Sequence, residues 1–439
     1  MDSSPALSPT QSAPRGGDIA VVGLWHLGSI AAAAWAATGH HVLAWDPGPA
    51  ARFELAAARG PVAEPGLEKT LLTAVERGLL TVVDVAEQAI AESRVTHLAF
   101  DTKVAPSGRA EDTRLEDAVH TFAAAAPDGA LLLISSQLPV GTCRRWRHIL
   151  DNEKRGLLLA HAPENLRLGR ALEDFLHPDR LLIGADDDKS FEQAAQSLAP
   201  FSTAPIRLGL TAAEMAKHAT NAYLALCIAF ANDLAWLSMS VDVDPNEVTA
   251  ALRADPRVSP TAPLRPGTAF SGATLTRDLV ALRDLGERCG RPELFSAVIE
   301  SNERHTDVAL GWLEESLGSF TGKRVAIAGL TYKPGTSTLR DSLPLKLVAQ
   351  LLERGATVAA WDPAAEPFAP PKGLTRARSL EACVKGADAL AVMTALPDLA
   401  GVDWPSLEPA RRLVVDGCMG VDRKVVEAAG WEYRGLAGP

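Results

Sequence analysis

The side chains of Lys217 and Asn221 form the clearest chemistry-bearing pair in this sequence. They stand four residues apart in an apolar stretch that is expected to be helical, so both fall on one helix face and can donate hydrogen bonds to a single oxygen. Asp278 could act as the base, and removing a proton from an alcohol needs such a base together with donors that hold the oxygen. The ordinary alternative is a lysine and an asparagine that simply face water.

Asp278 ends the segment PGTAFSGATLTRD, residues 266–278, in which Thr274 carries a hydroxyl and Arg277 a positive charge. An alcohol becomes a nucleophile only when a neighbouring base removes its proton. The residues around Thr274 supply no obvious base of this kind. We therefore do not expect the hydroxyl of Thr274 to act as a nucleophile on its own.

A second candidate site is the turn GLWHLG, which runs from Gly23 to Gly28 between an expected strand and an expected helix. Asp46 ends the following strand at the distance of an acid that binds an adenosine ribose, which favours NAD over NADP. Trp25 stands where a second glycine normally lets the backbone approach the pyrophosphate, so the indole must swing away or displace the cofactor. The alternative is a wound α/β turn that binds no nucleotide, but Asp46 and the helix N-terminus after Gly28 favour the cofactor.

Composition excludes several other classes of protein. The chain has 439 residues, 47% of them hydrophobic and 22% charged, and a net charge of −11. This balance argues against nucleic acid or an anionic membrane as the main partner. The five cysteines are scattered without CxxC or histidine pairing, which argues against a disulfide framework and a metal site and favours the cytoplasm. The apolar run at residues 19–38 fits a strand, a turn and a helix better than a membrane span.

Short β-branched runs alternate with Ala-rich helical patterns in both the first and the last part of the chain, with a long helical stretch between them. Each outer part has a strand, a glycine and a later strand ending in WDP. The fold class is therefore α/β, with two Rossmann-like doubly wound domains joined by a long helical central region. The expected divisions are a disordered tail at 1–17, a cofactor domain at 18–209, a central helical region for dimerisation and the active site at 210–318, and a C-terminal domain at 319–439.

The segment at 266–278 resembles the active-site loop PGxGxGGxCxxKD of the nucleotide-sugar dehydrogenases, the UDP-glucose/GDP-mannose dehydrogenase family, with Thr274 at the cysteine. APENLRLG from Ala162 is similar to the family's NPEFLxEG, and EMAKHATNAY from Glu214 is similar to its EMxKYxxNAF. The resemblance covers nearly everything after the tail. It implies NAD, two successive hydride transfers, and a cysteine that holds the intermediate as thiohemiacetal and thioester.

The resemblance also implies a role for each matching position. Residues implied in catalysis are Lys217, Asn221, Asp278, Glu164 and Thr274, with Glu164 handling water. Residues implied in cofactor binding are Gly23, Trp25, His26, Leu27, Gly28, Asp46, Thr102, Ser136 and Arg340. Residues implied in substrate binding are Leu166, Arg167, Lys217, Asn221, Arg257, Phe270, Gly272, Arg277 and Lys333. Arg257 is usually donated by the partner subunit, so a homodimer is expected.

Three functions remain open at this point. The first is an NAD-dependent oxidoreductase that oxidises an alcohol of a UDP-sugar or similar nucleotide sugar, in polysaccharide or glycoside biosynthesis, once to the carbonyl or twice through its hydrate. The second is a redox-neutral epimerase that retains NAD. The third is a catalytically silent homologue that binds a nucleotide sugar. Retention of Glu164, Lys217, Asn221 and Asp278 beside Thr274 favours the first. Buried polar and charged groups cost stability unless they are paired, so keeping four of them indicates a use.

Overall fold

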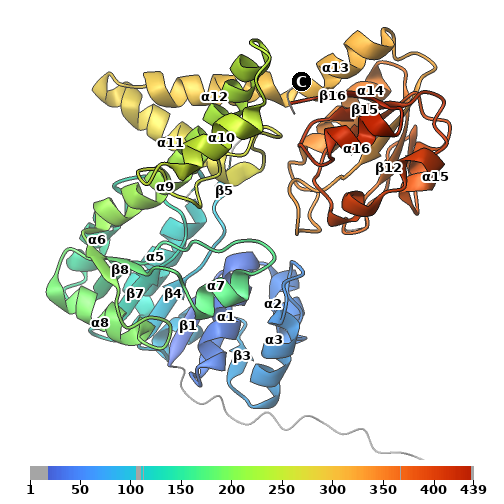
Figure 1. Cartoon of the computed structure of the whole chain (residues 1–439). Helices are drawn as coiled ribbons and strands as arrows, with labels where there is room; N and C mark the ends of the chain where they lie inside the picture. Colours follow the sequence, from blue (N-terminus) through green and yellow to red (C-terminus); the bar gives the residue numbers. More distant parts are fainter. Residues whose placement is uncertain (1–17, 105–109, 112, 366, 437–439) are drawn as a thin grey trace, which may run out of the picture. The chain divides into compact units, whose positions relative to one another are not determined.

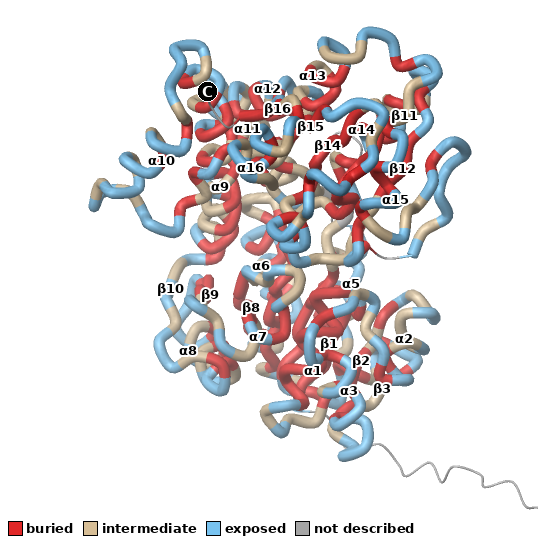
Figure 2. The backbone as a smooth tube through the Cα atoms, turned by 45° about the vertical axis from the view of Figure 1, so that its right-hand side comes forward, coloured by how far each residue is buried: buried red, intermediate tan, exposed pale blue. Residues whose placement is uncertain are grey.

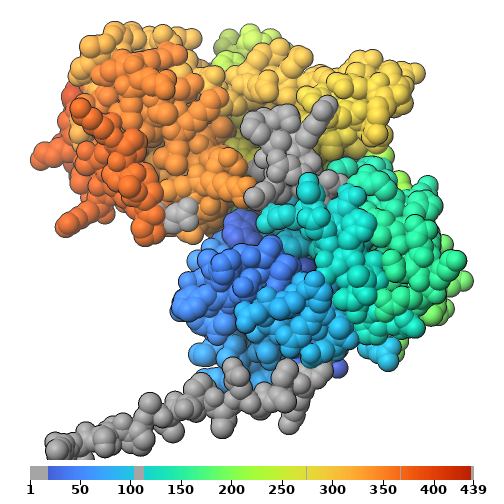
Figure 3. Space-filling view, turned by 180° about the vertical axis from the view of Figure 1, so that it is seen from behind, coloured from blue at the N-terminus to red at the C-terminus, as the bar shows by residue number. Residues whose placement is uncertain are grey.

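The computed structural model describes residues 18–104, 110–111, 113–365 and 367–436, which form two compact units. Unit 1 comprises Met1–Lys103 and Ala110–Lys217, and unit 2 comprises Val104–Arg109 and His218–Pro439. Atoms coloured blue to green in Figure 3 belong to unit 1, and those coloured lime to red belong to unit 2. The expected tail at 1–17 lies outside the described residues.

Unit 1 contains an eight-stranded sheet in the order β10-β9-β8-β7-β4-β1-β2-β3. Its strands are β1 Ile19–Val22, β2 Val42–Trp45, β3 Leu80–Val82, β4 Val95–Leu98, β7 Leu131–Ile134, β8 Leu158–His161, β9 Leu182–Gly184 and β10 Ile206–Leu208. Its helices are α1 His26–Ala37, α2 Pro49–Ala56, α3 Leu67–Glu76, α4 Ala86–Ala91, α5 Thr113–Ala125, α6 Thr142–Asn152, α7 Ala171–Leu176 and α8 Asp188–Leu198. The short strands β5 Lys103–Val104 and β6 Ala110–Glu111 pair separately.

The chain order of the strands in this sheet places a crossover between β1 and β4. Six strands, β3-β2-β1-β4-β7-β8, run in the order of a doubly wound dinucleotide-binding sheet and pair in parallel (Figure 1). In such a sheet, ligands bind at the carboxyl ends of the strands where the strand order reverses. The turns after β1, β4 and β7 are therefore the expected place for the cofactor.

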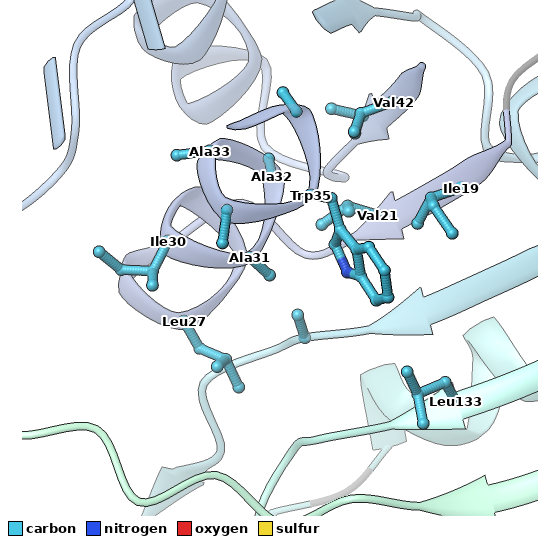
Figure 4. Packing of buried hydrophobic residues seen from close by; sticks show 14 of the residues in the cluster. Ile19, Val21, Leu27, Ile30, Ala31, Ala32, Ala33, Trp35, Val42 and Leu133 are labelled. Atoms are coloured by element: carbon cyan, nitrogen blue, oxygen red, sulfur yellow. The ribbon is translucent and has the colours of Figure 1, made fainter. Parts of the chain in front are cut away.

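Both faces of the unit 1 sheet are covered. Leu131 and Leu133 of β7 belong to one apolar cluster with α1, while Leu132 and Ile134 belong to another with α5. This alternation follows from the two-residue period of a strand. Figure 4 shows Trp35 pointing from α1 toward the strands that carry Val21 and Leu133.

The indole of Trp35 is the first member of a buried chain of hydrogen bonds. Its Nε1 donates to Nδ1 of His97 at 3.0 Å, and Nε2 of His97 hydrogen-bonds to the hydroxyl of Ser135 at 2.8 Å. Burial lowers the pKa of His97 to about 4, so the ring is neutral at neutral pH. This chain satisfies polar groups that would otherwise cost stability inside the sheet layer.

Unit 2 contains a second sheet and most of the central helical segment of the chain. The helices of the segment are α9 Leu210–Met239, which begins in unit 1, α10 Pro245–Ala254, α11 Ala273–Cys289, α12 Glu293–Thr306 and α13 Val308–Leu317. The long helical stretch expected in the central region is divided into separate helices, the first break lying between Met239 and Pro245. Asp242 has a positive φ of 58°, and the side chain of Asp244 caps the new helix by accepting from the backbone NH of Asn246. Pro245 then occupies the first helical position, where its missing NH costs nothing.

The second sheet has the order β13-β12-β11-β14-β15-β16, and all its pairs are parallel. Its strands are β11 Arg324–Ala328, β12 Thr357–Trp361, β13 Leu374–Arg376, β14 Ala389–Val392, β15 Leu413–Asp416 and β16 Glu432–Gly435. Its helices are α14 Leu343–Glu353, α15 Leu380–Val384 and α16 Arg423–Ala428, with 3-10 turns at Pro397–Gly401 and Trp404–Ser406. Figure 2 shows that the strands of both sheets are mostly buried. The same winding order in both sheets confirms the predicted pair of Rossmann-like domains.

One described helix, α9, is long and apolar enough to span a membrane by length and composition alone. In its most apolar window, 44% of the residues are buried inside the protein. A core helix passes the same test, and α9 carries the buried polar side chains of Glu214, Lys217, His218 and Asn221.

Candidate active site

The turn after β1 is built around two glycines. Gly23 has φ of +96°, and a Cβ at Gly28 would stand 1.6 Å from the carbonyl oxygen of Gly23. Only glycine allows helix α1 to begin so close to the strand. Trp25 lies between them as the N-cap residue of α1 and is 42% exposed, so its indole does not fill the core beneath the turn. The tight turn and close helix approach fit a dinucleotide, and the tryptophan lies on the outer side of this turn.

Asp46 connects this turn to the end of β2. Its Oδ2 accepts the backbone NH of Leu24 and its Oδ1 that of Gly48, each at 2.8 Å. Asp362 does the same in the second sheet, where it accepts the backbone NH of Leu330 at 2.7 Å and that of Ala364 at 2.9 Å. The aspartate of each WDP sequence therefore fixes a turn in addition to any ribose contact. Each oxygen of Asp46 thus accepts one backbone NH and has a second lone pair for a ligand hydroxyl, whereas the oxygens of Asp362 accept further hydrogen bonds from Thr331 and Ala365.

His26 in the same turn contacts a glutamate that the sequence reasoning missed. Its Nε2 lies 2.9 Å from Oε1 of Glu64, a buried carboxylate that also accepts the backbone NH groups of Gly169 and Ala171. Burial alone would raise the pKa of Glu64, but the hydrogen bonds from His26 and these two NH groups lower it. Glu64 thus joins the cofactor turn to the segment before α7. An isolated glutamate in AEPGLE carries no sequence signal of such a role.

Thr102 and Ser136 follow the neighbouring strands β4 and β7. The hydroxyl of Thr102 donates to the carbonyl oxygen of Gln137 at 2.6 Å, and the hydroxyl of Ser136 donates to that of Leu98 at 3.5 Å. Both residues are thus anchored at the carboxyl edge of the sheet, as the cofactor prediction requires. Leu27 lies nearby at the start of α1, where its backbone NH donates to Asp101 at 3.2 Å.

The segment APENLRLG forms a loop after β8. A carboxylate oxygen of Glu164 accepts the backbone NH of Leu166 at 2.5 Å, which closes a local turn. Arg167 makes a bidentate pair with the buried Asp174, through Nε at 2.9 Å and Nη2 at 2.6 Å, and reaches Asp179 at 3.2 Å. The guanidinium predicted to bind substrate is therefore already held by two carboxylates.

Lys217 is 5% exposed, and its Nζ donates to the amide oxygen of Asn165 at 3.3 Å. Asn165 belongs to the same APENLRLG loop. One helical turn before Lys217, the buried carboxylate of Glu214 accepts the backbone NH groups of Gly141 and Cys143 at the start of α6. This carboxylate anchors the first turns of α9 to the sheet, and so fixes the position from which Lys217 extends.

In unit 2, Asp278 on α11 is fully buried and is held by side chains from two helices. Its Oδ1 accepts from Nε of Arg277 at 3.0 Å and lies 3.1 Å from Nδ1 of His218, while Oδ2 accepts from the amide of Asn221. Burial acts to raise the pKa of Asp278, but the histidine contact and the charge of Arg277 outweigh it and lower the pKa. The carboxylate is ionised at neutral pH. His218 was not among the predicted site residues.

The loop before α11 is held by three polar side chains that the sequence reasoning also missed. Asn302 brackets Phe270, accepting its NH at 2.8 Å and donating to its carbonyl at 3.0 Å. Asn232 accepts the NH of Gly267 at 2.8 Å, and His305 contacts the carbonyl oxygen of Gly267 at 2.7 Å. Gly272 has φ of +82° and caps α11. These contacts present Thr274, an exposed residue in the first turn of α11.

The remaining predicted residues lie at the surface of unit 2. The side chain of Arg257 is 88% exposed and pairs with Asp255 at 2.6 Å. Lys333 places its Nζ 5.5 Å from the ring centre of Tyr332, and Arg340 is exposed with Nε 3.7 Å from Asp341. Arg257 and Arg340 are thus each close to an acidic neighbour, Asp255 and Asp341 respectively.

Three family models match this chain. The NAD binding domain of the UDP-glucose/GDP-mannose dehydrogenase family matches residues 17–201, its central domain residues 211–304, and its UDP binding domain residues 326–423. The chain is 29% identical over 442 residues to a UDP-glucose 6-dehydrogenase of Pseudomonas aeruginosa, covering 96% of this chain and 97% of that protein.

Solved structures of nucleotide-sugar dehydrogenases are also similar to this chain. A UDP-glucose dehydrogenase from the archaeon Pyrobaculum islandicum is 30% identical with a TM-score of 0.86, covering 99% of this chain and 100% of that one. A UDP-D-ManNAc dehydrogenase from Pyrococcus horikoshii is 27% identical with a TM-score of 0.85, covering 95% and 99%. The chain therefore belongs to the UDP-glucose/GDP-mannose dehydrogenase family of NAD-dependent oxidoreductases.

Proposed function

We propose that this protein oxidises an alcohol carbon of a UDP-sugar, or a similar nucleotide sugar, without a cysteine nucleophile. The observation that carries the proposal is the buried, ionised Asp278, which is bound by Asn221 on the helix that also carries Lys217. In the first turn of α11, Thr274 stands where the family pattern has cysteine. Burying polar and charged groups costs stability unless they are paired, and here Asp278 is paired with Asn221 and Arg277.

In this proposal, bound NAD would supply the acceptor for the hydride of the alcohol carbon. Gly23, Gly28 and Asp46 would hold the cofactor together with His26 and Leu27, Thr102 and Ser136 would face its nicotinamide half, and Arg340 would contact it from the second domain. Lys217 and Asn221, one turn apart on α9, donate to the substrate oxygen as it becomes a carbonyl. Asp278 supplies the negative charge that favours removal of the alcohol proton.

The first product is the carbonyl compound. A second oxidation, where it occurs, starts from the hydrate of an aldehyde, with Glu164 positioning the water. An acyl-enzyme has no place in this scheme, because no thiol stands at residue 274 and the hydroxyl of threonine is a poor nucleophile without a dedicated base. Phe270, Gly272 and Arg277 shape the sugar side of the site, and Lys333 and Arg257 bind the diphosphate.

We also propose that the protein works as a homodimer in the cytoplasm. Tyr223, Phe230 and Leu237 recur every seven residues along α9 and are 52%, 48% and 65% exposed. An apolar stripe of this kind is typical of a contact with another helix. A second copy of the chain is the partner that would also bring Arg257 to the substrate. The proposed divisions remain 18–209 for the cofactor, 210–318 for dimerisation and the active site, and 319–439 for the nucleotide sugar.

The experiment that tests the missing nucleophile is intact-protein mass spectrometry during turnover, with quantification of NADH per product. The proposal predicts unmodified protein and carbonyl product with one NADH, or acid with two. A covalent acyl group on Thr274 would contradict it. The exposed Trp25 favours one competing function, a binding protein without activity, which would bind a nucleotide sugar and produce no NADH.

A further inference from the structure

A fully buried histidine lies in the middle of the unit 1 sheet. His97 of β4 stands in register with Val21 of β1 on one side and with Leu133 of β7 on the other. The central strands of a parallel sheet are ordinarily apolar, because both faces of the sheet are covered. A polar ring at this place needs hydrogen-bond partners, and Trp35 of α1 and Ser135 supply them.

These partners fix the direction of each hydrogen bond. An indole NH is a donor only, so Nδ1 of His97, which lies 3.0 Å from Nε1 of Trp35, must be the acceptor. A neutral ring then carries its proton on Nε2, which donates to the hydroxyl oxygen of Ser135 at 2.8 Å. Burial lowers the pKa of His97 to about 4, so the ring keeps this form at neutral pH.

The chain of hydrogen bonds ends at the first residue after β7. The backbone NH of Ser135 also donates to the carbonyl oxygen of Leu98 at 3.0 Å. Two residues further on, the carbonyl oxygen of Gln137 accepts from the hydroxyl of Thr102 at 2.6 Å. Ser136 lies between these two anchored residues, and its own hydroxyl makes a long contact of 3.5 Å to Leu98. The backbone of Ser136 is therefore held from both sides.

The loop after β7 lies at the edge of the sheet where the second half of a dinucleotide is expected. Asp46 at the end of β2 marks the adenosine side, and β4 and β7 lie across the reversal of strand order from it. This placement agrees with the roles proposed for Thr102 and Ser136. A loop that binds a ligand gains affinity when it is held in the binding geometry beforehand.

A fully paired polar chain in a protein interior fixes one arrangement of the elements that it joins. Here it joins α1, the helix that begins at the turn expected to bind the pyrophosphate, to β4 and to the loop after β7. A second buried histidine, His161 of β8, contacts the same loop, with Nε2 3.4 Å from the carbonyl oxygen of Ser136. The contact from His97 is the shorter of the two.

We infer that His97 is a positioning residue, which holds Ser135, and through it Ser136, in the geometry that binds the nicotinamide half of NAD. The inference rests on the placement of the cofactor in the proposed function. Trp35 orients the imidazole, and the imidazole orients the hydroxyl of Ser135. The effect of His97 reaches the cofactor through the loop.

The comparison that separates positioning from support of the fold is binding of NAD and of ADP-ribose, which lacks the nicotinamide. Calorimetric titration measures both Kd values in the wild type, His97→Leu, His97→Gln and Ser135→Ala. Leucine neither accepts nor donates a side-chain hydrogen bond, whereas the amide of glutamine can accept from Trp35 and donate to Ser135. His120→Leu, on the exposed face of α5, is the control, and circular dichroism verifies folding.

His97→Leu and Ser135→Ala should weaken NAD binding by about 3- to 10-fold, the worth of one hydrogen bond, and leave ADP-ribose binding within about 2-fold. His97→Gln should bind NAD within about 2-fold of the wild type, and His120→Leu should match it. Equal losses for NAD and ADP-ribose would show that the chain only supports the fold. Unchanged NAD binding would show that the loop does not depend on it. Either result overturns the inference, and Ser135→Ala provides it should His97→Leu not fold.

A second readout is the protonation of the ring itself. In the protein labelled with ¹⁵N-histidine, the signals that are absent in His97→Gln should report a neutral ring protonated on Nε2 at neutral pH. A charged ring, or one protonated on Nδ1, would contradict the assignment. A wild type that binds NAD but forms no NADH with any nucleotide sugar would remove the proposed function and leave this inference intact, whereas a wild type that binds neither NAD nor ADP-ribose would remove both.

Discussion

The amine of Lys217 donates a hydrogen bond to the amide oxygen of Asn165 at 3.3 Å. Asn165 stands where the family pattern NPEFLxEG has phenylalanine, so the lysine contacts a polar acceptor that this pattern does not provide. Such an acceptor holds the buried amine in place, because a buried amine without a hydrogen-bond partner costs stability. The chain thus differs from the pattern at a residue that touches one of its proposed catalytic groups.

Removal of this acceptor should weaken catalysis modestly. Asn165→Ala should lower kcat by about 3- to 10-fold, the worth of one hydrogen bond that fixes a donor. Asn165→Asp should lower it further, because the new charge attracts the amine more strongly than the substrate oxygen does. Steady-state NADH formation measures both, with the exposed Asn152→Ala as the control. Equal kcat in all four proteins would show that Asn165 does not position Lys217.

Thr274 and Lys217 should respond differently to truncation. Thr274→Ala should keep activity within about 5-fold, whereas Lys217→Ala should lose about 100-fold or more, because it removes a donor to the developing oxyanion. The comparison uses kcat for one substrate. Similar large losses in both variants would assign Thr274 a chemical role that the present scheme lacks.

Trp25 should limit the affinity for NAD. Trp25 occupies the position where a glycine normally lets the backbone approach a pyrophosphate. It is 42% exposed and lies beside His26. Trp25→Gly should lower the Kd for NAD in calorimetric titration, and Trp25→Phe should leave it nearly unchanged. Weaker binding by Trp25→Gly would show instead that the indole contacts the cofactor.

Glu64 should stabilise unit 1 in a pH-dependent way. Its pKa is lowered from the ordinary value of 4.5 in the folded protein, so its stabilisation is complete above that value and is lost as pH falls through the folded pKa. Glu64→Gln should lower the free energy of unfolding by about 1–3 kcal/mol at neutral pH. The difference from the wild type should shrink in acid.

Urea unfolding at several pH values measures this difference. Glu68→Gln, an exposed residue in the first turn of α3, is the matched control and should change little. A difference between Glu64→Gln and the wild type that stays constant with pH would mean that the ionised form of Glu64 contributes nothing specific.

The stripe on α9 should mediate association. Phe230→Asp places a charge at its centre and should convert a dimer to monomers in analytical ultracentrifugation, since burying an unpaired charge is costly. Phe53→Asp, which changes another exposed phenylalanine on α2, should not. A wild type that is monomeric at all concentrations would contradict the proposed dimer.

Local patterns were sufficient to predict both wound sheets. IAVVG, HVLAWD and RVAIAGL are short β-branched runs next to glycine turns, and they became β1, β2 and β11. Edge strands such as β10, with the sequence IRL and mostly exposed residues, lack such a run and were not predicted. The break between α9 and α10 depends on the capping side chain of Asp244, which a reading by apolar period alone overlooks.

The candidate site residues that the sequence suggests fall in contiguous segments. Lys217 and Asn221 share one helix face and Asp278 ends one loop, so their types and spacing make them candidates. His218, Glu64 and Asn302 act through partners 32 or more residues away along the chain, and no local pattern reports such contacts. Pairings of this kind become visible only when the fold brings the segments together.

The most direct test of the central claim is to incubate the purified protein with NAD and a panel of UDP-, GDP- and TDP-sugars, following NADH by absorbance and products by mass spectrometry. We predict a product that has lost two hydrogens with one NADH formed, or an acid with two. NAD reduction that accompanies neither product would contradict the account. Equally, no NADH and no product with any sugar of the panel would show that the chain is not a working dehydrogenase.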